Sequence, residues 1–190
     1  GEGTRPGLAQ RRFVLVVGTL EPRKNWPGLI RAWTRLRHTT GLPHRLVIAG
    51  GKGWLADGIF AAAQASPYRA DIVFTGFVDD ADLPALYAAA DVFAFPSRYE
   101  GFGIPVVEAL ACGAPVVCAD NSSLPEAAGD AALLVACDDD EALAAALQSL
   151  IEDQPLRARL RTAGLAQAAR FTWPSAAATL WQTYQETYHA

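Results

Sequence analysis

Several features are scarce in this chain of 190 residues. It has no methionine, three cysteines, three histidines and a formal net charge of -4. The cysteines (Cys112, Cys118 and Cys137) are odd in number and lack metal-ligand spacing, which argues against a disulfide framework or a zinc site and favours buried thiols. The negative net charge gives no sign of a basic surface for nucleic acid, and no apolar run reaches the length of a membrane span. We therefore expect a soluble protein that binds small ligands.

The start of the chain predicts a piece of a longer protein. Residues 1–11 begin without methionine and are rich in glycine, so they resemble a linker or a cloning remnant more than a targeting signal. Residues 12–190 are long enough for one domain with its own core, and a hydrophobic content of 51% is typical of a globular protein.

Two catalytic signatures are also missing. No G-x-S-x-G elbow is present, and the three histidines (His38, His44 and His189) are not clustered, which disfavours serine hydrolysis and a catalytic histidine. The G-x-G-x-x-G fingerprint does not follow the first predicted strand, which disfavours an NAD dehydrogenase.

What the chain does contain is a regular alternation of short apolar runs and amphipathic stretches. Such alternation predicts an α/β fold with a doubly wound parallel sheet of about six strands and helices on both faces, whose ligands lie at the carboxyl ends of the strands. The predicted strands are 13–17, 45–49, 72–74, 91–95, 115–118 and 131–135, and the predicted helices are 26–38, 57–66, 82–90, 104–112, 138–152, 155–170 and 174–189.

The most informative turn follows the predicted strand 91–95. Gly101 and Gly103 allow positive φ and close backbone approach, so backbone amides at the start of the next helix can bind an anion such as a phosphate. Glu100 and Glu108 flank this turn, and a carboxylate accepts hydrogen bonds from adjacent hydroxyls of a ribose or a hexose. A glycoside hydrolase would need its two carboxylates on opposite sides of the scissile bond, which one turn does not provide.

The loop after the first predicted strand contains a second set of residues that could bind an anion. Gly18 precedes Arg23 and Lys24, two cations beside a helix whose predicted N-cap is Asn25. Two cations at a helix start suit a diphosphate, although a solvated basic pair is the alternative. The glycine-rich turn at 50–54 is also compatible with an anion.

Three weaker signals remain. The main chain at Phe77 and Val78 could pair with the edge of a nucleobase, but an aromatic residue and a valine after a strand more often belong to the core. The segment 122–126 is either part of the site or a helix cap with a first-turn glutamate, and the helix near 83 has Asp80 or Asp82 as its expected cap.

These residues resemble those of a known family. The run E-G-F-G-I-P-V-V-E at 100–108 is similar to the E-x7-E motif of GT-B glycosyltransferases of family 4, the group 1 glycosyltransferases. The segments 109–117 and 122–126 support the likeness, which extends from residue 13 to the last helix. The chain thus resembles the carboxyl-terminal, donor-binding domain of a retaining, mannosyltransferase-like enzyme.

The resemblance implies a role for each motif residue. Glu100 would hold hydroxyls of the donor sugar, and Lys24, assisted by Arg23, would neutralise the leaving nucleotide. The chain departs from the family at Thr19, where many members carry an arginine, and Arg23 is the residue assigned as the second cation. The remaining donor-binding positions would be Gly18, Phe77, Val78, Gly101, Phe102, Gly103, Ile104 and Glu108, with Glu108 on the ribose.

The resemblance also implies the partners. The donor would be a nucleotide-diphosphate sugar, with GDP-mannose favoured and a UDP-sugar as the alternative, and no bound metal or other cofactor is expected. The amino-terminal acceptor domain would be absent from this chain, so the chain alone would bind donor and transfer nothing. Two other functions stay open: a non-catalytic GT-B nucleotide-sugar binding module and a GT-B sugar-nucleotide epimerase.

Two expectations concern location and packing. The resemblance implies a role in polysaccharide synthesis in the cytoplasm, with any peripheral contact to the inner membrane made through the missing domain. The rings of Trp173, Trp181, Tyr184 and Tyr188 recur at near-helical spacing and are expected to pack mostly in the core. The family offers the alternative that this helix reaches toward the missing domain.

Overall fold

The computed structural model describes residues 12–188 and contains one six-stranded sheet. All neighbouring strands pair in parallel, in the order β3-β2-β1-β4-β5-β6, which confirms the predicted doubly wound fold. The predicted linker 1–11 and His189 lie outside the described residues. The strands are β1 Phe13–Val17, β2 Arg45–Ala49, β3 Ile72–Gly76, β4 Val92–Phe95, β5 Val116–Ala119 and β6 Ala132–Val135.

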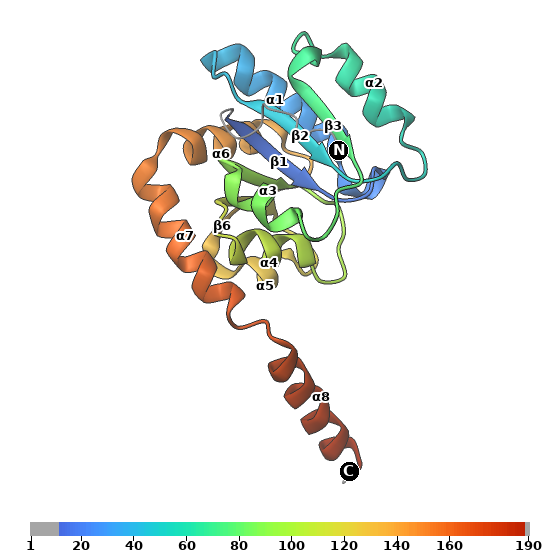
Figure 1. Cartoon of the computed structure of the whole chain (residues 1–190), viewed down its shortest axis with the longest axis vertical. Helices are drawn as coiled ribbons and strands as arrows, with labels where there is room; N and C mark the ends of the chain where they lie inside the picture. Colours follow the sequence, from blue (N-terminus) through green and yellow to red (C-terminus); the bar gives the residue numbers. More distant parts are fainter. Residues whose placement is uncertain (1–11, 189–190) are drawn as a thin grey trace, which may run out of the picture.

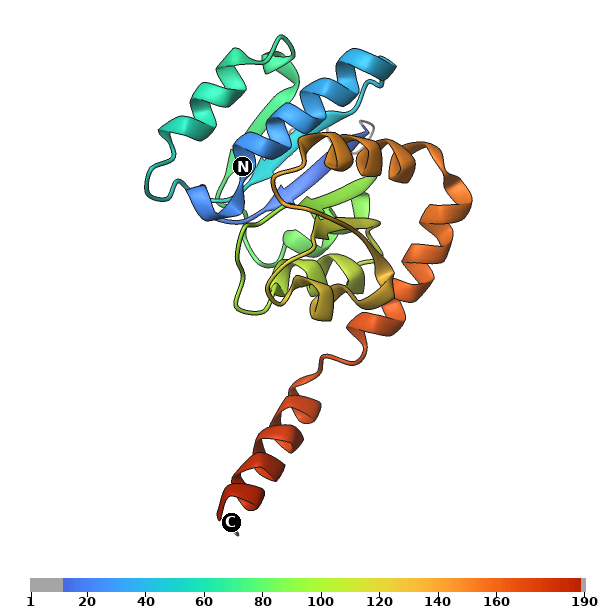
Figure 2. The ribbon, with the colours of Figure 1, turned by 180° about the vertical axis from the view of Figure 1, so that it is seen from behind.

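Helices cover both faces of the sheet (Figures 1 and 2). One face carries α1 Trp26–Thr40, α2 Asp57–Ala65 and α6 Asp140–Glu152, and the other carries α3 Leu83–Ala89 and α4 Ile104–Ala111, with α5 Leu124–Ala128 beside α4. The helix α7 Gln154–Ala168 packs against α4 and α6, and α8 Trp173–Tyr188 ends the described chain. Short 3-10 turns occupy Pro22–Lys24, Arg69–Asp71 and Gly129–Ala131.

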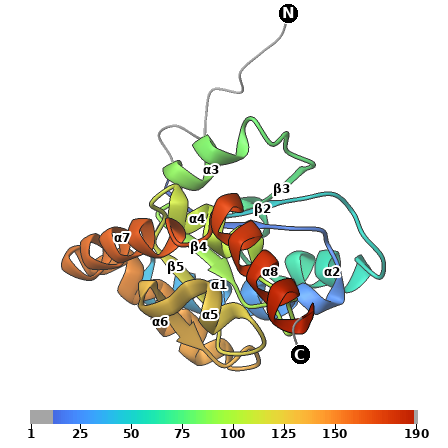
Figure 3. The same ribbon diagram turned by 90° about the horizontal axis from the view of Figure 1, so that it is seen from below.

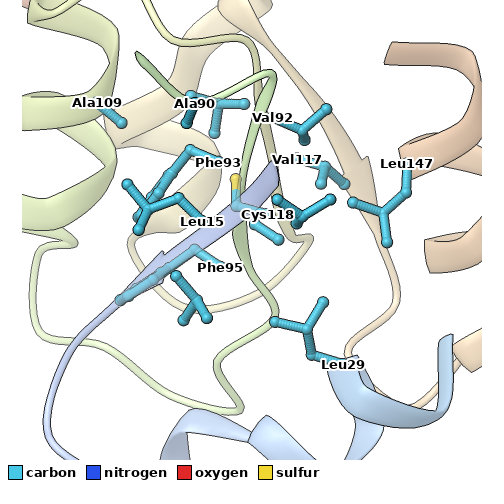
Figure 4. Packing of buried hydrophobic residues seen from close by; sticks show 14 of the residues in the cluster. Leu15, Leu29, Ala90, Val92, Phe93, Phe95, Ala109, Val117, Cys118 and Leu147 are labelled. Atoms are coloured by element: carbon cyan, nitrogen blue, oxygen red, sulfur yellow. The ribbon is translucent and has the colours of Figure 1, made fainter. Parts of the chain in front are cut away.

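The strands form because their residues can be buried on both sides. All four residues of β4 are buried, as expected of a central parallel strand between two helical layers. Figure 4 shows Phe93 on the side of Ala109 of α4, while Val92 and Val117 lie toward Leu147 of α6. Alternate side chains of one strand thus reach opposite layers, and the two cores fix the sheet between them.

Some expected details differ from the structure. Asp82 is the residue before α3 but its side chain caps nothing. The helix start considered at 122–126 exists as α5, with Glu126 in its first turn, but no side chain caps it. Side-chain caps occur instead at Asp139, which accepts bonds from two backbone amides of α6, and at Asp153 before α7. Of the three thiols, only Cys118 is fully buried.

The last helix departs most from expectation. Figures 1 and 2 show α8 projecting away from the sheet and its covering helices, and in Figure 3, seen from below, α8 lies in front of them. No residue of α8 is buried. Trp173 is 90% exposed, Trp181 64% and Tyr184 62%, so the prediction that these rings pack in the core is wrong. Neither α8 nor any other helix in the described part is long and apolar enough to span a membrane.

Candidate functional site

The strand order reverses between β1 and β4, and the loops that leave these two strands meet at the carboxyl edge of the sheet. In an open α/β sheet this switch point is the usual ligand site. The two loops are joined by hydrogen bonds. The Arg98 amide donates to the carbonyl of Arg23 at 2.8 Å, and the Arg23 guanidinium donates to the carbonyl of Tyr99 at 2.7 Å.

A compact charged cluster lies where these loops meet. One carboxylate oxygen of Glu100 accepts hydrogen bonds from Lys24 Nζ at 2.8 Å and from the Ser97 hydroxyl at 2.7 Å. The other lies 2.6 Å from Nη1 of Arg23. Glu100 and Lys24 are only 8% and 7% exposed, and the ammonium of Lys24 also lies 4.7 Å from the ring centre of Phe95. The structure therefore brings together the three residues that the sequence analysis assigned to catalysis.

This cluster keeps Glu100 ionised. Burial by itself would raise the pKa of the carboxyl group, but hydrogen bonds from Lys24, Ser97 and Arg23 outweigh burial, so the pKa lies below its ordinary value. A charged carboxylate accepts hydrogen bonds and donates none, which suits it to bind hydroxyl groups.

The backbone of Glu100 is fixed by two serines that the sequence analysis did not assign to it. Its amide donates to the Ser122 hydroxyl at 3.1 Å, and its carbonyl accepts from the Ser123 hydroxyl at 3.0 Å. Ser122 has φ of +50°, which an L-residue adopts only at some cost. A strained residue held against a site residue is typical of a functional site.

The glycine-rich turn after Glu100 uses its two glycines differently. Gly103 has φ of +96° and directly precedes α4, and a Cβ there would lie 2.8 Å from Leu124. Gly101 has no positive φ and open space around it, so the expectation of positive φ is wrong for Gly101. The backbone amides of Phe102, Gly103 and Ile104 make no hydrogen bond within residues 12–188. These are the amides expected to bind a diphosphate.

Glu108 lies one turn into α4 and is exposed. Its Oε2 accepts a hydrogen bond of 2.9 Å from the hydroxyl of Tyr87, a buried residue of α3. Within the described residues no hydrogen bond or ion pair joins Glu108 to the cluster around Glu100. The two glutamates are thus held independently on one strand-turn-helix unit.

The loop after β1 is shaped by close contacts. A Cβ at Gly50 would lie 2.0 Å from the carbonyl oxygen of Gly18, so the loops after β1 and β2 approach as only glycine allows. Asn25 precedes α1 but makes no side-chain cap, which corrects the predicted role. Its side chain instead bonds to the Cys137 carbonyl and to Arg98, and so ties the loop after β6 to the site.

The segment expected to contact a nucleobase follows β3. Gly76 ends the strand with φ of +74°, Phe77 is 76% exposed and Val78 is half-buried. Within residues 12–188 no hydrogen bond links this segment to the Glu100 cluster. The Gly76 carbonyl accepts a hydrogen bond of 2.9 Å from the Gly50 amide of the neighbouring loop. Groups of three or more His, Cys, Asp or Glu side chains able to hold a metal are absent from the described part of the chain.

Comparison with known proteins identifies the family. The model of the family described as "Glycosyl transferases group 1" matches residues 6–167. The chain belongs to the group 1 glycosyltransferases. This finding confirms the resemblance drawn from the E-x7-E motif and its neighbouring segments.

Individual relatives agree with the assignment of this chain to the group 1 glycosyltransferases. O-antigen chain mannosyltransferase B of Escherichia coli is 42% identical over 87% of this chain, and a D-inositol 3-phosphate glycosyltransferase of Stackebrandtia nassauensis is 37% identical over 95%. A sucrose-phosphate synthase from Thermosynechococcus elongatus matches 95% of this chain with a TM-score of 0.83 and 29% identity. The structural neighbours have the GT-B fold. The chain spans 44%, 43% and 46% of these three proteins, less than half of each.

Proposed function

We propose that this chain is the nucleotide-sugar binding half of a retaining glycosyltransferase that transfers a hexose to an acceptor. The observation that carries the proposal is the cluster of Arg23, Lys24 and Glu100 at the switch point of the sheet. Cations beside free backbone amides bind a diphosphate, and a fixed carboxylate binds sugar hydroxyls. The E. coli relative, named as a mannosyltransferase, favours mannose as the hexose, and we propose GDP-mannose as the donor, with a UDP-sugar as the alternative.

Each group has a place in donor binding. The amides of Phe102, Gly103 and Ile104 and the cations Lys24 and Arg23 contact the diphosphate. Glu100 accepts hydrogen bonds from hexose hydroxyls, and Glu108 accepts them from the ribose. The main chain at Phe77 and Val78 pairs with the base, while Gly18 lets the first loop approach the phosphates.

The chemistry follows from charge. When the bond between the anomeric carbon and the phosphate oxygen breaks, its electron pair stays on the leaving nucleoside diphosphate. Glu100 holds Lys24 and Arg23 beside the site before reaction, and both cations can then stabilise that charge. The oxygen of the acceptor hydroxyl then bonds to the same sugar carbon on the face that retains its configuration, and its proton passes to the phosphate oxygen of the leaving nucleoside diphosphate. We propose that these two side chains, and not a metal ion, supply the positive charge.

The acceptor half lies outside this chain in the proposal. Two observations support this: the chain spans less than half of its relatives, and no residue of α8 is buried, with Trp173 90% exposed. Leu180 and Trp181 are 55% and 64% exposed, and burying such side chains against the amino-terminal half would be favourable. We propose that α8 packs on that half.

Calorimetry tests the donor-binding proposal. We expect one of GDP, UDP and ADP to bind the chain with a dissociation constant between about 1 μM and 1 mM, and Lys24→Ala to weaken it at least about tenfold. Arg35→Ala is the matched control, because Arg35 pairs with Glu141 on the outer surface of α1. Absence of binding by all three nucleotides, or equal effects of the two variants, would reject the proposal. Assay of the full-length protein with a panel of nucleotide sugars then identifies the transferred hexose.

A further inference from the structure

Glu108 is an exposed carboxylate held by a buried hydroxyl. The hydroxyl of Tyr87 donates to Oε2 of Glu108 at 2.9 Å, although Tyr87 is only 1% exposed and lies on a different helix. The ring of Tyr87 packs edge-on against Phe93 of β4, with the ring centres 5.3 Å apart. The hydroxyl therefore has a fixed position, set by the core.

The chemistry of this pair makes the hydrogen bond one-directional. Burial, and then the negative charge of Glu108, raise the pKa of the Tyr87 hydroxyl above its ordinary value, so the hydroxyl stays protonated. A protonated phenol donates and the ionised carboxylate accepts. The bond occupies one acceptor position on Oε2 and leaves the others free.

Orientation of the carboxylate matters for what it can bind. A glutamate on an exposed helix surface samples several side-chain rotamers, and fixing one of them on binding costs conformational entropy. With Tyr87 holding Oε2, the carboxylate is already oriented before a ligand arrives, and such preorganisation increases affinity. Two neighbouring hydroxyls, as on a ribose, need both acceptor oxygens in a defined plane.

We propose that Tyr87 is a positioning residue, which holds the Glu108 carboxylate in the orientation that accepts both hydroxyls of a nucleotide's ribose. The inference rests on the proposed function, since it requires Glu108 to face the ribose. It goes further by assigning the preference for ribose over a deoxygenated sugar to a residue of α3 that touches no ligand.

The test compares ribose with its dideoxy form. Calorimetry on the 190-residue chain uses the nucleoside diphosphate that binds best and its 2′,3′-dideoxy counterpart. We expect the wild type to prefer the ribose form by about tenfold or more, as expected for hydrogen bonds to a charged group. Tyr87→Phe keeps the ring and removes the hydroxyl. It should reduce the preference to about threefold or less and leave the dideoxy affinity unchanged within about twofold.

A matched control and a second variant complete the design. Tyr68→Phe is the control, because Tyr68 also packs among rings but its hydroxyl makes no hydrogen bond within the described residues. If Tyr87→Phe does not fold, Glu108→Asp shortens the side chain by one methylene and withdraws the carboxylate from Tyr87. The same loss of preference is then expected.

Three results would overturn the inference. An unchanged preference in Tyr87→Phe, with Glu108→Ala abolishing it, would reject the role of Tyr87 and leave the proposed function intact. Equal losses for both nucleotides would show that Tyr87 acts only on the structure of the site. No preference in the wild type, together with no effect of Glu108→Ala, would reject this inference and the assignment of Glu108 to the ribose.

Discussion

Glu100 already has two cationic partners in the structure. Lys24 and Arg23, the groups proposed to bind a diphosphate, lie 2.8 Å and 2.6 Å from its carboxylate oxygens. A phosphate would compete with this carboxylate for the same N–H donors. The sequence could name these three residues, but it could not show their pairing, because the pair of Lys24 and Glu100 spans 76 residues of chain.

Neutralising Glu100 should therefore separate nucleotide binding from sugar binding. We expect Glu100→Gln to strengthen binding of the bare nucleoside diphosphate by about threefold to tenfold, because a competing charge is removed. Binding of the sugar donor should gain less or weaken, because the amide side chain accepts fewer hydrogen bonds from sugar hydroxyls. Calorimetry with both ligands checks this, with Glu141→Gln as a control on the outer surface. Weaker binding of both ligands by the same factor would contradict competition within the cluster.

At the scale of elements, burial decided what could be predicted. The strands and most helices were recognisable because their apolar residues follow the pattern that two-sided burial requires, and β4 is the clearest case. Helix ends were less predictable: Asn25 and Asp82 occupy cap positions, yet their side chains make no cap. For 122–126 the sequence left a site segment and a helix start open, and α5 does begin there. The hydrogen bonds of Ser122 and Ser123 to Glu100 could not be predicted, because they join positions 22 and 23 residues apart.

The two glycines before α4 give a matched pair of variants. Gly103→Ala should destabilise the fold by about 1–3 kcal/mol, because φ of +96° strains any L side chain and the new Cβ would press on Leu124. Gly101→Ala should change the free energy of unfolding by less than about 0.5 kcal/mol, because open space surrounds that position. Denaturant titrations of the two variants measure this difference. Equal destabilisation would mean that the conformation of Gly103 is not what the turn requires.

At the scale of the whole molecule, the chain divides into a packed α/β body and one projecting helix. The body carries every residue assigned to donor binding, and α8 contributes no buried residue to it. The sequence indicated an amphipathic helix here correctly. It could not show what the rings of that helix contact, because burial within a domain and burial against another domain leave the same pattern.

Removal of α8 should leave the body intact. We expect a chain that ends at Phe171 to unfold cooperatively, with a midpoint temperature within about 2 °C of the parent, and to bind nucleotide equally well, because no buried side chain is lost. A chain that ends at Asp153 also loses Leu160, Gly164 and Ala168, which are buried in α7. That chain should be severely destabilised. Differential scanning calorimetry distinguishes the two truncations, and a large loss on removing α8 alone would show that it stabilises the body.

The long chain separation of Lys24 and Glu100 has a consequence for ligand binding during biosynthesis. The two residues meet only when β1 and β4 lie side by side, so neither an early segment of the nascent chain nor a proteolytic piece carrying one of them holds the charged cluster. A nucleotide that needs this cluster therefore binds only the completely folded chain. At a hundred times its dissociation constant it would stabilise that fold by about 2.7 kcal/mol. The metabolite would then protect finished molecules from degradation and leave incomplete ones exposed to proteases.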